Sequence, residues 1–279
     1  MSPRPADTFP ARTAPARTVL GVSLKMYFGY ERTLAWSRAV AGAVAANAAA
    51  RRAVAEGEVE LFVLPTAPAV LAAREILAPA GIGVGGQDLS WADAGAFTGE
   101  LSGAVLAELG CGYAEVGHAE RRRLLGEDDA MVAAKTAAAL RNGLTPVLCV
   151  GEPERGTAED AVEHCCRELA AVVNPPGLDA APAGRLILAY EPHWAIGAPE
   201  PASPAHVSAV AEGLAETLAS LPGREGSQVL YGGSAGPGLL ARLSPAVAGL
   251  FLGRFAHDPA AFGAVLAEAT ARAGQGAAA

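Results

Sequence analysis

Several polar residues stand directly after short apolar runs, and they are of the types that transfer protons and bind anions. They are the hydroxyl of Ser23 and the ionisable side chains of Lys25, His118, Glu120 and Glu191. Two glycine-rich segments follow later runs, and they contain Gly232, Gly233 and Ser234, then Gly253 and Arg254. Glycine lets the backbone approach an anion closely. A carboxylate, an imidazole, a lysine and two such turns together predict a site for a small anion.

Eight short apolar runs must position these residues. They are Thr18–Leu24, Val59–Leu64, Gly81–Gly85, Tyr113–Gly117, Thr145–Val150, Arg185–Tyr190, Gln228–Tyr231 and Ala248–Leu252. Most are rich in Val, Ile or Leu and lack strict alternation of apolar and polar residues. This pattern is typical of parallel strands that are buried on both faces.

Helical patterns separate the runs. They cover Leu34–Ala50, Ser102–Leu109, Ala130–Asn142, Ala158–Val173, Pro204–Leu221, Gly238–Leu243 and Pro259–Ala273. Strands that alternate with helices in this way predict a closed (β/α)8 barrel, and a doubly wound open sheet is the alternative. In such a barrel the chemistry lies on the loops after the carboxyl ends of the strands. The polar residues named above are therefore expected to converge, together with Gln87, Asp88 and Glu152.

The length of 279 residues allows one barrel or two ordinary domains. Because no linker-like stretch interrupts the alternation, we expect a single domain over residues 17–279. Residues 1–16 are rich in Pro, Ala, Arg and Thr, and we expect a disordered tail there. With 51% apolar residues the chain can bury a sizeable core, which excludes a disordered protein.

The charge balance and the cysteines limit the partners and the compartment. Lys and Arg number 21 against 29 Asp and Glu, so the net charge of −8 disfavours nucleic acids and anionic membranes as partners. The start of the chain has no apolar core of a signal peptide, and no run is long enough to span a membrane. The four cysteines form neither a disulfide framework nor a metal-binding spacing. We therefore expect a cytoplasmic protein without a bound metal.

The same residues carry a resemblance to a known family. The segments Ser23–Met26, Gly95–Glu100, Val116–Arg122, Tyr190–Gly197 and Tyr231–Ser234 follow one another in the order seen in triosephosphate isomerases. The similarity runs from about Val19 to the C-terminal helix. It implies a TIM barrel without a cofactor that isomerises a small phosphorylated sugar, and a role in glycolysis and gluconeogenesis.

The resemblance also implies roles for individual residues. Glu191 matches the base that moves a proton between an aldose phosphate and a ketose phosphate through an enediolate. His118 matches the electrophile that polarises the carbonyl, and Lys25 matches the cation that favours the dianionic substrate. Glu120 matches a partner of this group. Residues Pro192–Ala198 match a mobile lid that excludes water.

Phosphate binding and dimer formation are implied in the same way. Backbone N–H groups at Gly197, Ser234, Gly253 and Arg254 would hold the phosphate, with Ser23, Gly232 and Gly233 beside it. Such local amides can bind a dianion despite the acidic balance of the chain. The segment Gly95–Glu100 resembles the loop whose tip, here Thr98, enters the neighbouring subunit of a homodimer.

The chain departs from the family pattern at positions that bear on the substrate. The residues concerned are Ser23 for Asn, Leu24 for Trp, Ala119 for Ser, His193 for an apolar residue, Ala198-Pro199-Glu200 for Thr-Gly-Lys, and Arg254 for Gly. Pro199 should stiffen the end of the lid. Arg254 adds a guanidinium that could bind a phosphate or a hydroxyl. The smaller side chains at positions 23, 24 and 119 are consistent with room for a further carbon.

These features leave three functional interpretations. The first is interconversion of glyceraldehyde 3-phosphate and dihydroxyacetone phosphate. The second is isomerisation of four-carbon ketose phosphates, the erythrulose phosphates, because the ending with Gly253-Arg254 resembles a side branch of the family. The third, a non-catalytic barrel that binds a phosphate ligand, is disfavoured because such a protein needs none of Glu191, His118 and Lys25 to titrate or polarise.

Overall fold

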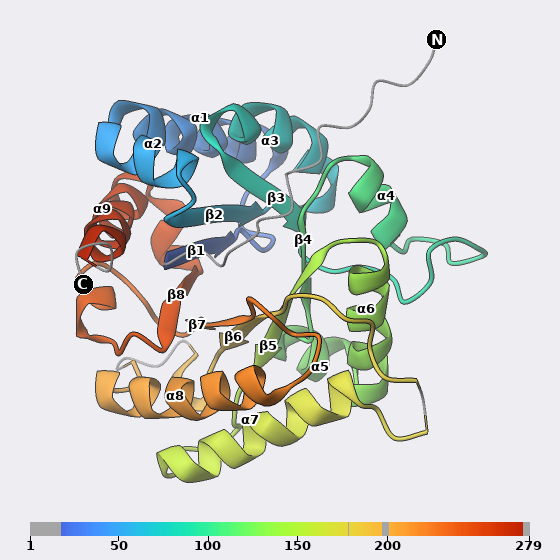
Figure 1. The fold of residues 1–279 in the computed structure, drawn as a ribbon. Coiled ribbons are helices and arrows are strands. Elements are labelled where there is room, and N and C mark those ends of the chain that lie inside the picture. Colours follow the sequence, from blue (N-terminus) through green and yellow to red (C-terminus); the bar gives the residue numbers. More distant parts are fainter. Residues whose placement is uncertain (1–17, 178, 197–200, 276–279) are drawn as a thin grey trace.

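Eight parallel strands form a closed barrel in the computed structural model, which describes residues 18–177, 179–196 and 201–275 (Figure 1). The strands are β1 (Thr18–Ser23), β2 (Val59–Leu64), β3 (Ile82–Gly86), β4 (Tyr113–Val116), β5 (Thr145–Val150), β6 (Ile187–Tyr190), β7 (Gln228–Tyr231) and β8 (Val247–Leu252). Each pairs with the next along the chain, and β8 pairs with β1. The predicted barrel is confirmed and the open-sheet alternative is wrong. The expected tail over residues 1–16 lies outside the described residues.

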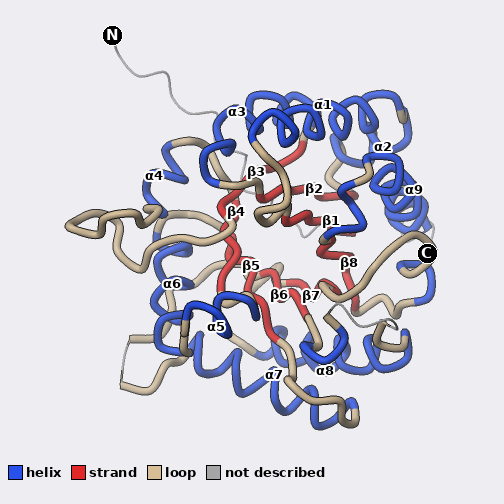
Figure 2. Tube along the Cα trace, turned by 180° about the vertical axis from the view of Figure 1, so that it is seen from behind, coloured by secondary structure: helices blue, strands red, loops and turns tan. Residues whose placement is uncertain are grey.

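Helices enclose the ring of strands (Figure 2). They are α1 (Tyr30–Ala46), α2 (Ala48–Ala55), α3 (Val70–Leu77), α4 (Gly103–Glu108), α5 (Ala119–Leu125), α6 (Asp129–Arg141), α7 (Ala158–Val173), α8 (Pro204–Ser220) and α9 (Pro259–Gln275). Short 3-10 turns are η1 (Ala67–Ala69), η2 (Ala78–Ala80), η3 (His193–Ala195), η4 (Leu240–Arg242) and η5 (Arg254–His257). No helix in the described part of the chain is long and apolar enough to cross a membrane.

Two of the predicted helices differ in the structure. The pattern over residues 34–50 is divided at Asn47, whose extended backbone ends α1 and whose side chain accepts a hydrogen bond from the Ala50 N–H to begin α2. The pattern over residues 238–243 forms only the single turn η4, because Gly238 before it has a left-handed φ of 84° and Leu243 after it is already extended.

Aromatic rings fill the middle of the barrel. Phe62 stacks on Tyr113 with ring centroids 4.5 Å apart, although β2 and β4 are not neighbours in the sheet. A Cβ atom at Gly21 would lie 2.2 Å from the Phe62 ring, so β1 needs glycine there. At the amino-terminal end of the strands, Glu60 accepts hydrogen bonds from Tyr113 and Arg185. The barrel is therefore packed below its carboxyl end, and space for a ligand is left at the top.

An ion-pair cluster fixes the loop after β3 against α5 and α6. The Lys135 Nζ atom lies 2.8 Å from Asp88 Oδ1 and 2.5 Å from Glu127 Oε1. Arg121 pairs with the same two carboxylates, at 2.8 Å and 2.7 Å. Arg121 lies on α5, and this helix begins directly after His118. The cluster therefore holds one side of the predicted site.

The segment Gly95–Glu100 extends away from the barrel between β3 and α4 (Figure 1). Its residues are exposed, and Phe97 packs edge-on against Trp91 with ring centroids 5.3 Å apart. The left-handed φ values of Gly95 and Gly99 let the chain reverse direction there.

Candidate active site

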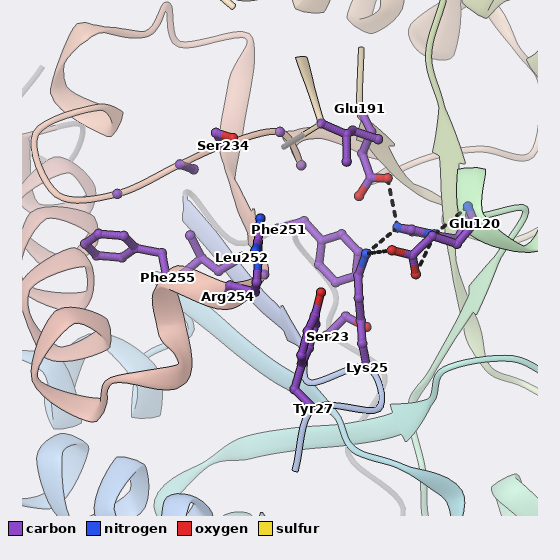
Figure 3. Close-up of a pocket in the computed structure, with 17 residues that line it drawn as sticks. Ser23, Lys25, Tyr27, Glu120, Glu191, Ser234, Phe251, Leu252, Arg254 and Phe255 are labelled. Carbon is purple, nitrogen blue, oxygen red and sulfur yellow. Dashed lines mark hydrogen bonds and ion pairs between the residues drawn. The ribbon is translucent and has the colours of Figure 1, made fainter. Parts of the chain in front are cut away.

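A cavity of about 750 Å³ opens at the carboxyl end of the barrel (Figure 3). It is lined by Ser23, Lys25, Tyr27, His118, Glu120, Glu191, Ile196, Gly232, Gly233, Ser234, Ala235, Gly236, Phe251, Leu252, Gly253, Arg254 and Phe255. The cavity thus brings together the acid–base residues and the two glycine-rich turns that the sequence predicts for the site, whereas Gln87, Asp88 and Glu152, which were also expected to converge there, are not among its lining residues. Gly197 and the segment Ala198-Pro199-Glu200 lie outside the described residues.

Lys25 follows β1 in a strained backbone conformation. Its φ of 48° is left-handed, which is uncommon for a residue with a side chain. The amide of Gln87 donates hydrogen bonds to the carbonyl oxygens of Lys25 and Leu64, at 3.0 Å and 2.9 Å, and so holds this turn. The Lys25 Nζ atom donates to Glu120 Oε1 at 2.9 Å. Although burial would lower the pKa of Lys25, this hydrogen bond and nearby carboxylates raise it, and the ammonium stays charged.

His118 is held as a neutral imidazole. It precedes α5, and its Nδ1 atom accepts a hydrogen bond from the Glu120 N–H at 3.1 Å. Burial and then the charge of Lys25 lower the pKa of His118 to about 4. Because Nδ1 is an acceptor, the single ring proton sits on Nε2. That atom faces the cavity, 3.1 Å from Lys25 Nζ and 3.2 Å from Glu191 Oε2.

Glu191 follows β6 and is only 4% exposed. Burial and then the charge of Glu115 raise its pKa to about 8. Two glycines make room for it, because a Cβ atom at Gly232 would lie 2.6 Å from Glu191 Cγ and one at Gly151 would lie 2.0 Å from its carbonyl oxygen. A buried carboxylate beside a neutral imidazole is suited to remove a proton from carbon.

The two glycine-rich turns lie across the cavity from Lys25 and Glu120, as the positions of Ser234 and Arg254 in Figure 3 show. A Cβ atom at Gly233 would lie 2.3 Å from the Tyr231 hydroxyl, so this turn requires glycine. Arg254 begins η5 and is exposed at the cavity. These backbone segments and one guanidinium can receive an anionic group while the acid–base side chains face the other end of a ligand.

The described part of the predicted lid is anchored by Glu152, which follows β5. Its Oε1 atom accepts hydrogen bonds from Trp194 Nε1 at 2.7 Å and from the Tyr190 hydroxyl at 3.1 Å. His206 lies against the same hydroxyl at 3.0 Å. Burial lowers the pKa of His193, the unusual residue of this segment. The anchoring role of Glu152 was not evident from the sequence, where it is one more carboxylate after a strand.

Two expectations about space in the cavity are wrong. Leu24 is 1% exposed and packs in the hydrophobic core outside the barrel interior, and Ala119 is part of α5; neither lines the cavity. Successive residues after a strand point in different directions, so a sequence comparison alone cannot say which substitutions reach the ligand. Ser23 is the one of the three that lines the cavity.

Glu115 is a residue that the sequence analysis missed. It lies on β4, is 3% exposed, and accepts a hydrogen bond from the Ser23 hydroxyl at 2.8 Å. Burial raises the pKa of Glu115 to about 7. The available signal was a charged residue inside an otherwise apolar run. Such a residue is rarely buried unless it has a polar partner.

The arrangement can move a proton at a carbon next to a carbonyl. Glu191 can act as the base, and the Nε2–H of His118 and the ammonium of Lys25 can polarise the carbonyl oxygen. Among the residues that the structure describes, no group of His, Cys, Asp and Glu could hold a metal ion.

Comparisons with known proteins agree with this geometry. The family model described as Triosephosphate isomerase matches residues 18–269. The L-erythrulose-1-phosphate isomerase of Pectobacterium atrosepticum is 51% identical over 253 residues, which cover 91% of this chain and 96% of that protein. The triosephosphate isomerase of Thermus thermophilus is 43% identical over 188 residues, 64% of this chain and 72% of that protein. The crystal structure of triosephosphate isomerase from Bartonella henselae matches with a TM-score of 0.72 and 30% identity, covering 91% of this chain and 98% of that one.

Proposed function

Since the chain belongs to the triosephosphate isomerase family and is a sugar-phosphate isomerase, we propose that its substrate is the four-carbon ketose phosphate L-erythrulose 1-phosphate. The observation that carries this proposal is the similarity to the Pectobacterium enzyme, which extends over 91% of the chain at 51% identity. The Thermus triosephosphate isomerase is similar over 64% of the chain only.

In the proposed reaction the carbonyl group moves from C2 to C3. Glu191 removes the proton from C3, while the Nε2–H of His118 and the ammonium of Lys25 stabilise the oxyanion that forms at C2. Glu191 then returns the proton to C2 of the enediolate, and His118 passes a proton between the two oxygens. No atom is gained or lost, and the product is erythrulose 4-phosphate.

The substrate phosphate would lie at the two glycine-rich turns. The backbone N–H groups of Ser234, Gly253 and Arg254, with Gly197 from the lid, would hold it. Ser234 and Arg254 lie across the cavity from Lys25 and Glu120 (Figure 3), which supports this placement because a phosphate beside the Glu120 carboxylate would be repelled. The lid would exclude water, so that the enediolate does not eliminate its phosphate.

The three-carbon reaction is a second candidate. It needs the same base, electrophile and cation, and the similarity to the Thermus enzyme favours it. It would place the protein in glycolysis and gluconeogenesis. A non-catalytic binding role is not favoured, because Glu191, His118 and Lys25 are held in a geometry that binding alone does not require.

The two reactions are distinguished by turnover of the purified protein. We expect kcat/KM for L-erythrulose 1-phosphate to exceed that for glyceraldehyde 3-phosphate by at least about tenfold, the effect of roughly one well-placed group. A preference for the three-carbon substrate would reject the proposal in favour of the second candidate. No turnover of either at high enzyme concentration would reject both.

Replacing Arg254 with alanine tests whether its guanidinium contributes to binding of the substrate phosphate. The backbone N–H remains, so phosphate binding by the turn is retained. Because the phosphate is common to both substrates, we expect kcat/KM for each to fall about tenfold, in line with the loss of one hydrogen bond to a charged group, and their ratio to stay unchanged. The exposed Arg38 on α1 offers the control Arg38→Ala. If Arg254→Ala and Arg38→Ala both keep the kcat/KM values of the unmodified protein, the Arg254 guanidinium does not contact the phosphate.

We also infer a homodimer, with Thr98 at the tip of the Gly95–Glu100 segment entering the partner. The projection of this exposed segment from the barrel supports the inference. Shortening the segment by four residues should give monomers in sedimentation velocity, with the helical circular dichroism signal retained. Dimers that persist at micromolar concentration would place the interface elsewhere.

A cytoplasmic location is inferred from the cysteines. All four are free thiols in the structure, and three of them are buried. Thiols in this state are typical of a reducing compartment.

A further inference from the structure

The side chain of Glu115 reaches across the interior of the barrel. β4 and β1 are separated by two other strands, yet Glu115 Oε2 lies 2.8 Å from Ser23 Oγ. Both residues are 3% exposed. Ser23 lines the cavity and Glu115 lies behind it, so a ligand would touch Glu115 only through Ser23.

This contact determines what Ser23 offers to a ligand. A hydroxyl has one proton to donate and two lone pairs that accept. The proton of Ser23 is used in the hydrogen bond to the Glu115 carboxylate. The part of the Ser23 oxygen that remains for the cavity is therefore an acceptor, which attracts a hydroxyl group and repels an oxyanion.

The position of Ser23 in the cavity indicates which hydroxyl this would be. If the phosphate lies at Ser234 and Arg254, and the reacting carbons lie between Glu191 and His118, the end of the substrate away from the phosphate points to Ser23 and Lys25 (Figure 3). In L-erythrulose 1-phosphate that end is the C4 hydroxymethyl group. A three-carbon substrate has no such group.

We propose that Ser23 recognises the C4 hydroxyl of the four-carbon substrate by accepting its hydrogen bond, and that Glu115 is the positioning residue that orients Ser23 for this contact. The proposal rests on the proposed function and adds the residues that select the substrate. Lys25 and the Nε2–H of His118 supply the hydrogen-bond donors that the reacting oxygens need. The accepting Ser23 oxygen is therefore free to bind a hydroxyl group that takes no part in the reaction.

The acceptor role depends on the charge state of Glu115. The titratable groups that face it are Lys25, Asp88, Glu120, Cys149 and Glu191. Burial raises its pKa to about 7, so the carboxylate is present above that pH and is protonated below it. Protonated Glu115 can donate to Ser23, which then turns its own proton to the cavity and loses its acceptor role.

The appropriate readout is the ratio of kcat/KM for L-erythrulose 1-phosphate to that for glyceraldehyde 3-phosphate. Glu191 is the base for both substrates, so its ionisation changes both values by the same factor and leaves their ratio unchanged. In the unmodified protein we expect this ratio to fall as the pH drops through about 7. Glu115→Gln should remove this pH dependence, since its amide oxygen can accept the Ser23 proton at any pH. Glu60→Gln is the matched control, because Glu60 is a carboxylate equally buried at the other end of the barrel, and it should keep the pH dependence.

Two further variants test the path through Ser23. At pH 8, Ser23→Ala and Glu115→Leu should each lower the ratio about tenfold, and the double variant should lower it no further, because both changes remove one interaction. Should Glu115→Leu fail to fold, Ser23→Ala and the pH profile of Glu115→Gln decide the matter.

Three results would each overturn the proposal. They are an unchanged ratio in Ser23→Ala, losses that multiply in the double variant, and a ratio independent of pH in the unmodified protein. Failure of the proposed function is a separate result, because the unmodified protein would then not turn over L-erythrulose 1-phosphate. If it does so and the variants keep the ratio, this inference alone is wrong.

Discussion

Glu191→Asp is expected to lower kcat about 10²–10³-fold while KM changes little. The shorter side chain withdraws the carboxylate from the substrate carbon, and proton abstraction depends on placement within about an ångström. The remaining contacts of the site, including the Lys25–Glu120 pair at 2.9 Å, do not involve this side chain and should persist. Steady-state kinetics with L-erythrulose 1-phosphate measure the effect, and loss of deuterium from C3 of labelled substrate reports the proton transfer itself.

The same substitution at an exposed position of α7, Glu163→Asp, is the matched control. It should leave kcat unchanged within about twofold. If Glu191→Asp also retained full kcat and full exchange of the C3 proton, Glu191 would not be the base, and the assignment of the acid–base group would have to be revised.

The charges at the site explain why a chain with a net charge of −8 can serve an anionic substrate. Glu120 is paired with Lys25, while burial raises the pKa of both Glu191 and Glu115 toward or above neutrality. These three carboxyl groups therefore do not all carry an unpaired negative charge at the same time. A dianionic phosphate would meet the amides and Arg254 on the opposite side of the cavity.

The strand ends could be predicted from the sequence because parallel strands buried on both faces leave continuous apolar runs, and the first polar residue after each run marks the active end of the barrel. Ser23, Lys25, His118 and Glu191 were identified by that rule. The division of the long helix at Asn47 was not, since an alanine-rich segment continues on both sides of it. There the local cap of one side chain outweighs the helical pattern.

Contacts across the barrel interior could not be predicted. Glu115 is inside an apolar run, and nothing in the run itself says that its partner is Ser23, 92 positions earlier. Gln87 was noted only as a polar residue after a strand, whereas its amide supports the strained turn at Lys25. Side-chain direction after a strand misled the interpretation of Leu24 and Ala119 for the same reason. Such relations depend on which strands face each other, and periodicity along one strand does not contain that information.

Lys135→Met is expected to cost about 3–5 kcal/mol of unfolding free energy, because Asp88 and Glu127 lose the more buried of their two cations. Lys135 is 2% exposed, and its ammonium lies against Asp88 and Glu127. Methionine fills a similar volume, so the loss arises from charge rather than from a cavity. Arg121 keeps both of its ion pairs in the variant but cannot replace the buried contacts. Urea unfolding followed by circular dichroism gives the change in free energy.

Arg141→Met is the control for this substitution. Arg141 pairs with Asp93 at 2.9 Å on the protein surface, where such a pair contributes about 0–1 kcal/mol. If the two variants were destabilised equally, burial would not strengthen the Lys135 cluster. The cluster also joins the loop after β3 to Arg121, which lies three residues after His118 in the sequence. If the Lys135→Met protein folds, both its kcat and its stability should therefore be lower than those of the unmodified protein. Arg141→Met should lower neither by a large factor. The comparison separates support of the site from general stability of the barrel.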